Sequence, residues 1–198
     1  MYRFIETLRI EDKKVFNFEA HNQRLNKTIR HFSPRSPEID LGEHISADLV
    51  QRTKCHIVYS DQVLSVSYQP YHPRPVHSLQ LIECDAIDYA YKYEDRDLLL
   101  SLYGQRGQCD DILIVKNGVI TDTSIANIAV YDGTQWYTPA HPLLRGTQRE
   151  LLLHQGLLTE REITPAELFS YRKLCTLNAM LDFEEMEFEI SDQTIKRP

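Results

Sequence analysis

The chain has 198 residues, a hydrophobic fraction of 42% and a formal net charge of −7. This length and composition suffice for one sizeable domain or two small lobes with a hydrophobic core. No block of lysine and arginine marks a nucleic-acid surface, and no apolar run is long enough for a membrane span or a signal peptide. We therefore expect a cytoplasmic globular protein that binds neither nucleic acid nor a membrane.

The four cysteines form no CxxC pair, and the eight histidines show no helical metal-ligand spacing. These patterns favour reduced thiols over a disulfide framework and argue against a zinc site. We expect no metal ion bound by protein side chains.

The N-terminal part predicts two strands, then a helix, then three more strands. Leu25, Ile29 and Phe32 recur at helical spacing, and prolines end this pattern at residues 34 and 37. His21 and Arg24 lie three residues apart on that helix, so we expect them near one another. The predicted strands are 2–10, 14–18, 55–59, 63–68 and 76–82, the predicted helix is 19–32, and 46–52 is a weaker helix. This part therefore reads as mixed α+β.

The acidic, tyrosine-containing stretch 84–94 is the best place for a boundary between lobes. It divides the chain into a small N-terminal α+β lobe, 1–84, and a larger C-terminal α+β lobe, 85–198, which carries Lys92. In the second lobe the pattern predicts helices at 95–105, 148–156 and from 165, and strands at 111–115, 119–121, 127–131, 135–138, 172–177 and 186–190.

Two capping boxes mark helix starts in the second lobe. Thr147 and Glu150 precede the apolar run at 151–153, and Thr164 and Glu167 flank a proline. The first helix is of chemical interest because the N–H groups of an opening turn attract phosphate.

Lys92 lies among three tyrosines and near Arg96. Partial burial and a neighbouring cation disfavour the ammonium form of a lysine, as an amine nucleophile requires. The alternative is a surface ion pair with Glu94 or Asp95.

Asp122 lies between two hairpin signals, Asn117-Gly118 and Asp132-Gly133. Alone, it would be expected to hydrogen-bond the next turn. With Lys92 it gains a second interpretation, because an aldehyde cofactor held by a lysine needs a carboxylate that keeps its pyridine nitrogen protonated. Arg24 could bind the cofactor phosphate through its guanidinium fork, or it could be a solvated helix residue.

In this order the segments resemble the class IV aminotransferase family, the fold-type IV enzymes that use pyridoxal 5'-phosphate (PLP). The similar segments are FIETLRI, FNFEAHNQRL, YKYEDR, NGVITDTSIANIAVYDGTQWYTP, LLRGTQR and LNAM. The resemblance covers most of the chain and implies a two-lobe α+β fold like that of D-amino-acid aminotransferase. Since the chain starts almost directly at FIETLRI, we expect a shortened N-terminal lobe.

The resemblance also implies a role for each matching residue. Lys92 would be the catalytic lysine, bonded to the cofactor and later carrying the Cα proton. Asp122, where the family usually has Glu, would face the pyridine nitrogen, and Arg24 the phosphate. The remaining cofactor-binding residues would be Leu144 on the ring face, Gly146, Thr147 and Gln148 at the phosphate, and Asn178 and Ala179 in a final loop nearby.

Within the family, two features are most similar to the aminodeoxychorismate lyases, which form 4-aminobenzoate and pyruvate for folate synthesis: Lys92 followed by Arg96, and Asn-Ala-Met at 178–180. An amino-acid aminotransferase of the branched-chain or D-amino-acid type is the alternative. A catalytically silent member acting as a binding protein is another, because of the short N-terminal lobe and Asp122. The resemblance implies a homodimer with a small, amino-acid-like substrate, whose carboxylate Arg9, Arg74, Arg96 or Arg106 could bind.

Overall fold

A computed structural model describes residues 2–197 and divides the chain into two units. Unit 1 consists of residues 1–73 and 91–95, and unit 2 consists of residues 74–90 and 96–198. The short segment 91–95, which contains Lys92, is therefore part of unit 1 by its contacts, although unit 2 begins before it in the sequence.

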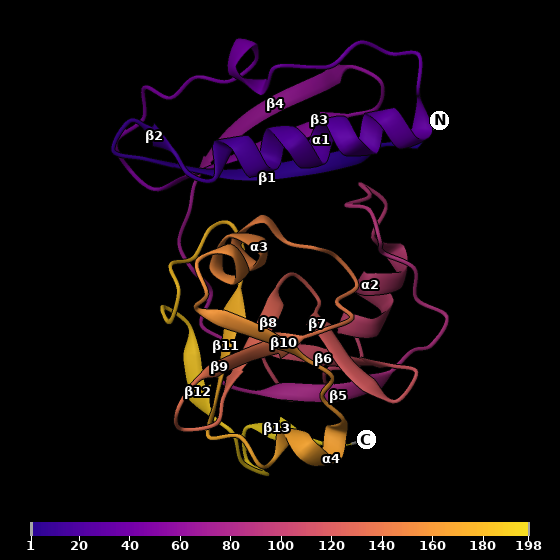
Figure 1. Cartoon of the computed structure of the whole chain (residues 1–198), viewed down its shortest axis with the longest axis vertical. Coiled ribbons are helices and arrows are strands. Elements are labelled where there is room, and N and C mark those ends of the chain that lie inside the picture. Colours follow the sequence, from indigo (N-terminus) through magenta and orange to yellow (C-terminus); the bar gives the residue numbers. More distant parts are fainter. Residues whose placement is uncertain (1, 198) are drawn as a thin grey trace. The chain divides into compact units, whose positions relative to one another are not determined.

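Unit 1 is a four-stranded antiparallel sheet with one long helix. Its elements are β1 (Phe4–Glu11), β2 (Lys14–Val15), α1 (Phe18–Phe32), the 3-10 helix η1 (Leu41–Glu43), β3 (Thr53–Tyr59) and β4 (Val63–Pro70). The strand order is β2-β1-β3-β4. Figure 1 shows α1 lying along β1 and β3. The core between them includes Phe4, Leu8 and Ile10 of β1 and Leu25 and Ile29 of α1.

The weak helix expected at 46–52 is wrong, since that segment holds no helix. Its backbone carbonyls are used elsewhere: Val50 O accepts from Asp12 N and Leu49 O from Lys13 N, both at 2.9 Å. Asp12 and Lys13 have positive φ angles in the turn between β1 and β2. Pairing with this turn replaces the helical hydrogen bonds, which local spacing could not show.

Over its described residues, unit 2 contains two sheets and three helices. The first sheet has the order β13-β5-β6-β7, and the second has the order β10-β9-β8-β11-β12. The elements are β5 (Leu79–Glu83), α2 (Asp97–Tyr103), β6 (Asp111–Lys116), β7 (Val119–Thr123), β8 (Asn127–Tyr131), β9 (Trp136–Pro139), α3 (Thr147–His154), β10 (Leu158–Arg161), α4 (Pro165–Leu168), β11 (Lys173–Leu177), β12 (Glu187–Glu189) and β13 (Ile195–Lys196).

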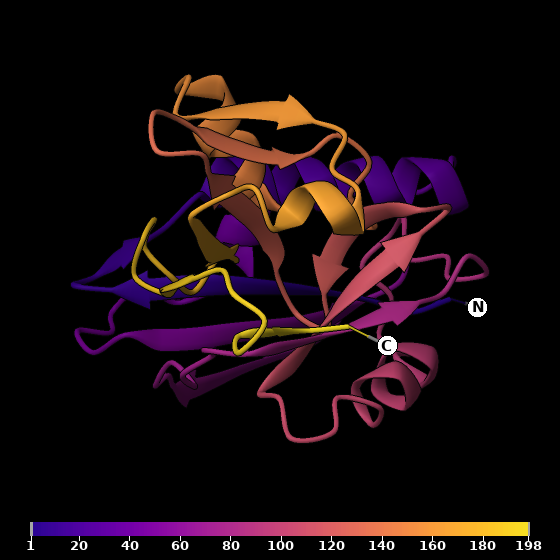
Figure 2. The same ribbon diagram turned by 90° about the horizontal axis from the view of Figure 1, so that it is seen from below.

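Most predicted elements are present, but β10 and β13 are additional. Both are short and pair in parallel, β10 with β9 and β13 with β5. The yellow C-terminal strand in Figure 2 is β13, which completes the first sheet. The mixed α+β prediction is confirmed. Among residues 2–197, no helix combines the length and apolarity that a membrane crossing requires.

Candidate active site

The backbone around Lys92 is attached to the N-terminal strand. Ile5 N donates to Lys92 O at 2.9 Å, and Glu94 N donates to Arg3 O at 3.0 Å. Tyr93 forms a β-bridge with Phe4. The segment that carries the candidate nucleophile thus extends one edge of β1.

Aromatic side chains fix the same segment from both sides of the lysine. The rings of Tyr91 and Tyr93 contact Phe4 at centroid distances of 6.4 and 5.2 Å, and Tyr91 stacks on His31 at 5.0 Å. Lys92 itself is half-buried. The charge of Lys92 also acts on His21. Burial is the main cause that lowers the pKa of His21, and the charges of Arg24 and Lys92 lower it further.

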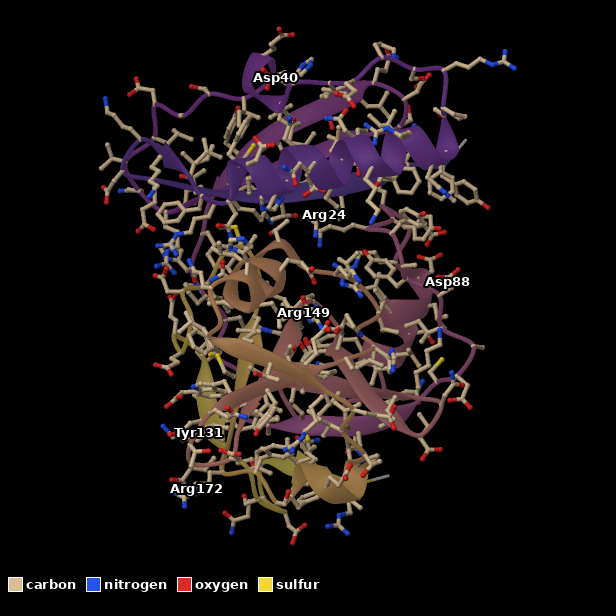
Figure 3. The ribbon with its side chains drawn as sticks, viewed as in Figure 1. Arg24, Asp40, Asp88, Tyr131, Arg149 and Arg172 are labelled. Atoms are coloured by element: carbon tan, nitrogen blue, oxygen red, sulfur yellow. The ribbon has the colours of Figure 1, made fainter. Side chains whose placement is uncertain are left out.

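Arg24 and His21 meet at a buried carboxylate. Arg24 Nε donates to Glu6 Oε1 at 2.8 Å and Arg24 Nη2 to Glu6 Oε2 at 2.6 Å, while His21 Nδ1 lies 2.6 Å from Glu6 Oε2. The expected proximity of His21 and Arg24 is confirmed. Glu6 was not among the predicted site residues, although it stands in the FIETLRI segment as a lone acid in an apolar strand. We call Glu6, His21 and Arg24 the Glu6 cluster; Figure 3 labels Arg24 on α1.

Asp122 lies near the end of β7 and is buried. Its Oδ1 accepts from Asn127 Nδ2 at 2.9 Å and its Oδ2 from Leu144 N at 3.0 Å. Burial raises the pKa of Asp122 to about 6, although the Leu144 N–H, the Asn127 amide and the charge of Arg149 act in the opposite direction. The carboxylate is therefore oriented on both oxygens but incompletely compensated for its loss of water.

Asn127 ties the Asp122 network to the start of α3. Its Nδ2 also donates to Leu144 O at 2.7 Å. A Cβ on Gly146 would lie 2.1 Å from Asn127 Oδ1, so only glycine leaves room for this amide. Asn127 was not among the predicted site residues. Its spacing from Asp122 within the segment TDTSIANI was the feature of the sequence that could have indicated it.

The helix start at 146–148 differs in detail from the prediction. Gly146 is the N-cap residue, Thr147 is the first residue of α3, and no side-chain cap is present, so the capping box expected at Thr147 and Glu150 is wrong. The chain conformation at Gly146, φ −71° and ψ 142°, shifts the start by one residue. The second box is confirmed, with reciprocal hydrogen bonds between Thr164 and Glu167.

Arg149 is a fully buried arginine of α3. Its Nη2 donates to Pro139 O at 2.8 Å and to Glu160 Oε1 at 2.7 Å, and its Nη1 to Glu150 Oε1 at 2.6 Å. Figure 3 labels this residue of α3. Its charge is one of the influences that lower the pKa of Asp122. Arg149 thus joins β9, β10 and α3.

The final loop is defined by Asn178, whose Oδ1 accepts from Met180 N at 2.9 Å. Asn178 and Ala179 are half-buried and directly follow β11. The structure thus gathers Asp122, Asn127 and Leu144 in one hydrogen-bonded network of unit 2, with Gly146 packed against Asn127, whereas Arg24 and Lys92 belong to unit 1.

The candidate carboxylate-binding arginines have protein partners. Arg9 and Arg74 pair with Glu11 and Asp111, Arg106 lies over the ring of Tyr103, and Arg96 Nη2 donates to Ser124 O at 2.6 Å. These contacts do not identify which of the four arginines would bind a substrate carboxylate.

A cavity of about 470 Å³ lies in unit 2. Its lining includes Asp88, Lys116, Thr121, His141 and Glu162 and none of the predicted site residues. Residues 2–197 contain no cluster of three or more histidine, cysteine or acidic side chains suited to a metal ion. The four cysteines are free thiols.

Comparisons with known proteins place these features in a family. The family model "Amino-transferase class IV" matches residues 91–183. An uncharacterized protein from Haemophilus influenzae is 37% identical over 188 residues, which cover 91% of this chain and 98% of that protein.

Solved structures share the fold. A crystal structure from Haemophilus somnus 129PT, named "putative 4-amino-4-deoxychorismate lyase", is 33% identical with a TM-score of 0.84, covering 91% of this chain and 97% of that one. The PLP-bound form of a hypothetical aminotransferase from Mycobacterium tuberculosis has a TM-score of 0.77 at 18% identity, covering 98% and 81%, and shows the common fold alone. The predicted fold-type IV architecture is confirmed. This chain therefore belongs to the class IV aminotransferase family.

Proposed function

We propose that this protein is a PLP-dependent enzyme with 4-amino-4-deoxychorismate lyase activity. The observation that carries the cofactor proposal is the buried Asp122 carboxylate, held by Asn127 and the Leu144 N–H. Burial penalises its charge and raises its pKa to about 6. A protonated pyridine nitrogen would supply the missing cation, so the residues present fit the ring of PLP.

The other ligands follow from family membership and are part of the proposal. Arg24 of unit 1 would be a phosphate ligand through its guanidinium fork. In unit 2, the backbone N–H groups of Gly146, Thr147 and Gln148 would be phosphate ligands too, because the first turn of a helix attracts an anion. Leu144 would pack on the ring face, and Asn178 and Ala179 would complete the phosphate loop.

Lys92 is the proposed catalytic residue. PLP, when bound, supplies an electron sink for the substrate's Cα. Lys92 would hold the cofactor through its aldehyde carbon and would move the Cα proton, a task that requires a neutral amine. The backbone bond from Ile5 N and the ring contacts of Tyr91 and Tyr93 fix the lysine's chain position.

Two observations favour the lyase over an aminotransferase. Arg96 follows Lys92 at the lyase-like spacing, and the 33% identical structure carries the lyase name. Elimination requires a leaving group on Cβ, whereas transamination requires reprotonation at the cofactor carbon and a second substrate. Family membership also supports the proposal of a cytoplasmic homodimer that contributes to folate synthesis.

The test begins with a spectrum of the purified protein after PLP is added. We expect a visible absorbance band in the wild type and its loss in Lys92→Ala. Failure of the wild type to bind PLP would refute the cofactor proposal.

A second assay separates the reactions. Supplied with 4-amino-4-deoxychorismate, the wild type should release 4-aminobenzoate and pyruvate in equal amounts, and Lys92→Ala should not. Amino-group transfer from amino acids to 2-oxoglutarate without this elimination would support the aminotransferase instead. PLP binding without any turnover would support the silent binding protein.

A further inference from the structure

Glu6 occupies a core position of β1. Side chains alternate along a strand, so Glu6 shares its face with Phe4, Leu8 and Ile10. Those three residues pack in the core beneath α1, and Glu6 is itself fully buried. An ionisable group in this row carries a large desolvation cost unless it is paired.

The partners of Glu6 determine its charge. Burial alone would raise the pKa of Glu6, but the charge and hydrogen bonds of Arg24, with those of His21, lower it to about 2. The pKa of His21 is lowered, chiefly by burial. Near neutral pH the cluster therefore contains an anionic Glu6, a cationic Arg24 and a neutral His21 that donates from Nδ1 to Glu6 Oε2.

Stability of the core does not explain this arrangement. Well-packed apolar residues that replace a buried ion pair often leave stability unchanged or increase it. The Glu6 cluster does achieve something that an apolar side chain cannot. It binds both Nε and Nη2 of Arg24 and so holds the guanidinium in one orientation. The long side chain of Arg24 is still 17% exposed.

We propose that Glu6 is a positioning residue for phosphate binding: it fixes the guanidinium of Arg24, with His21 supporting the same carboxylate. The inference rests on the proposed function through the role of Arg24 as a phosphate ligand. Glu6 acts through Arg24 and contacts no substrate.

Charge and orientation predict opposite outcomes when Glu6 is neutralised. The Glu6 anion repels a phosphate dianion, so an effect of charge alone would make Glu6→Gln bind PLP more tightly. Loss of the bidentate contact would leave Arg24 misoriented and weaken binding. The sign of the change distinguishes the two effects.

The experiment measures dissociation constants of PLP and of pyridoxal, which lacks the phosphate. For Glu6→Gln we expect the PLP constant to rise by roughly tenfold, the low end for a residue that orients a ligand-binding group, while the pyridoxal constant stays unchanged. Glu6→Asp keeps the charge but shortens the reach, and it should show the same phosphate-specific loss. It also serves if Glu6→Gln does not fold.

Glu11→Gln is the matched control. Glu11 also lies on β1 and accepts from Arg9 Nε at 2.7 Å and Arg52 Nε at 3.2 Å. Its substitution should leave both constants unchanged. In an Arg24→Ala background, Glu6→Gln should add no further loss of PLP binding, because the two residues act as one unit.

Equal weakening of PLP and pyridoxal in Glu6→Gln and Glu6→Asp would overturn the proposal, since it would indicate a general structural role. Unchanged or tighter PLP binding in both variants would also overturn it. These results concern Glu6 alone when the wild type binds PLP through Lys92. A wild type that binds no PLP refutes the proposed function, and this inference with it.

Discussion

Gly146→Ala would place a methyl group 2.1 Å from Asn127 Oδ1 and 3.3 Å from its Cγ. The backbone at Gly146 has a negative φ of −71°, which alanine adopts without strain. The cost of the substitution is therefore the collision with Asn127.

Asn127 cannot move away without losing its other contacts. Its Nδ2 donates to Asp122 Oδ1 at 2.9 Å and to Leu144 O at 2.7 Å. A neutral hydrogen bond contributes about 1 kcal/mol, and one to an ionised group about 1.5–3 kcal/mol. We expect Gly146→Ala to lower the free energy of unfolding by about 2–4 kcal/mol, within the range of overpacked sites.

Urea denaturation at neutral pH measures this change. Gly104→Ala controls for the general effect of adding a methyl group. Gly104 also has a negative φ of −58°, and a Cβ added there would lie 3.2 Å from the nearest atom. In an Asn127→Ala background the obstacle is absent, so Gly146→Ala should cost little. An equal cost in both backgrounds would refute the reasoning.

Two further predictions concern titration and thiol reactivity. Burial raises the pKa of Asp122 from 3.8 to about 6, so the folded protein binds the carboxyl proton of Asp122 more tightly than the unfolded chain does. The protonated carboxyl therefore stabilises the fold below the unfolded pKa. About 3 kcal/mol of the free energy of unfolding is lost as pH rises through 6. Urea denaturation across this window should show that loss in the wild type and not in Asp122→Asn, and parallel curves would contradict the assignment. Burial also raises the pKa of Cys55 to about 11 and of Cys175 to about 12, whereas Cys84 is half-buried. Iodoacetamide should label Cys84 first in the native protein, as mapped by mass spectrometry, and early labelling of Cys175 would argue against its burial.

Local patterns were sufficient for most elements. The spacing of Leu25, Ile29 and Phe32 defined α1, and the Asn117-Gly118 turn with its positive φ angles defined the hairpin of β6 and β7. These features depend on residues close in sequence. Hydrophobic periodicity and turn chemistry therefore predict them without knowledge of the fold.

Long-range pairing was beyond such patterns. Glu6 and Arg24 are eighteen residues apart, and Asp122 meets Leu144 twenty-two residues later. The quoted segments contained these residues, but no local rule joins a strand acid to a helix arginine. The erroneous helix at 46–52 has the same origin, because its carbonyls pair with a distant turn.

The attachment of segment 91–95 to β1 has a consequence for folding. The β-bridge between Phe4 and Tyr93 closes a long loop, so this part of unit 1 cannot form until most of the first half of the chain is available. Until then the edge of β1 at Phe4 and Ile5 lacks the hydrogen bond from Ile5 N to Lys92 O. Open edges of this kind promote pairing between chains. Once it is in place, the lysine segment therefore covers this edge of β1.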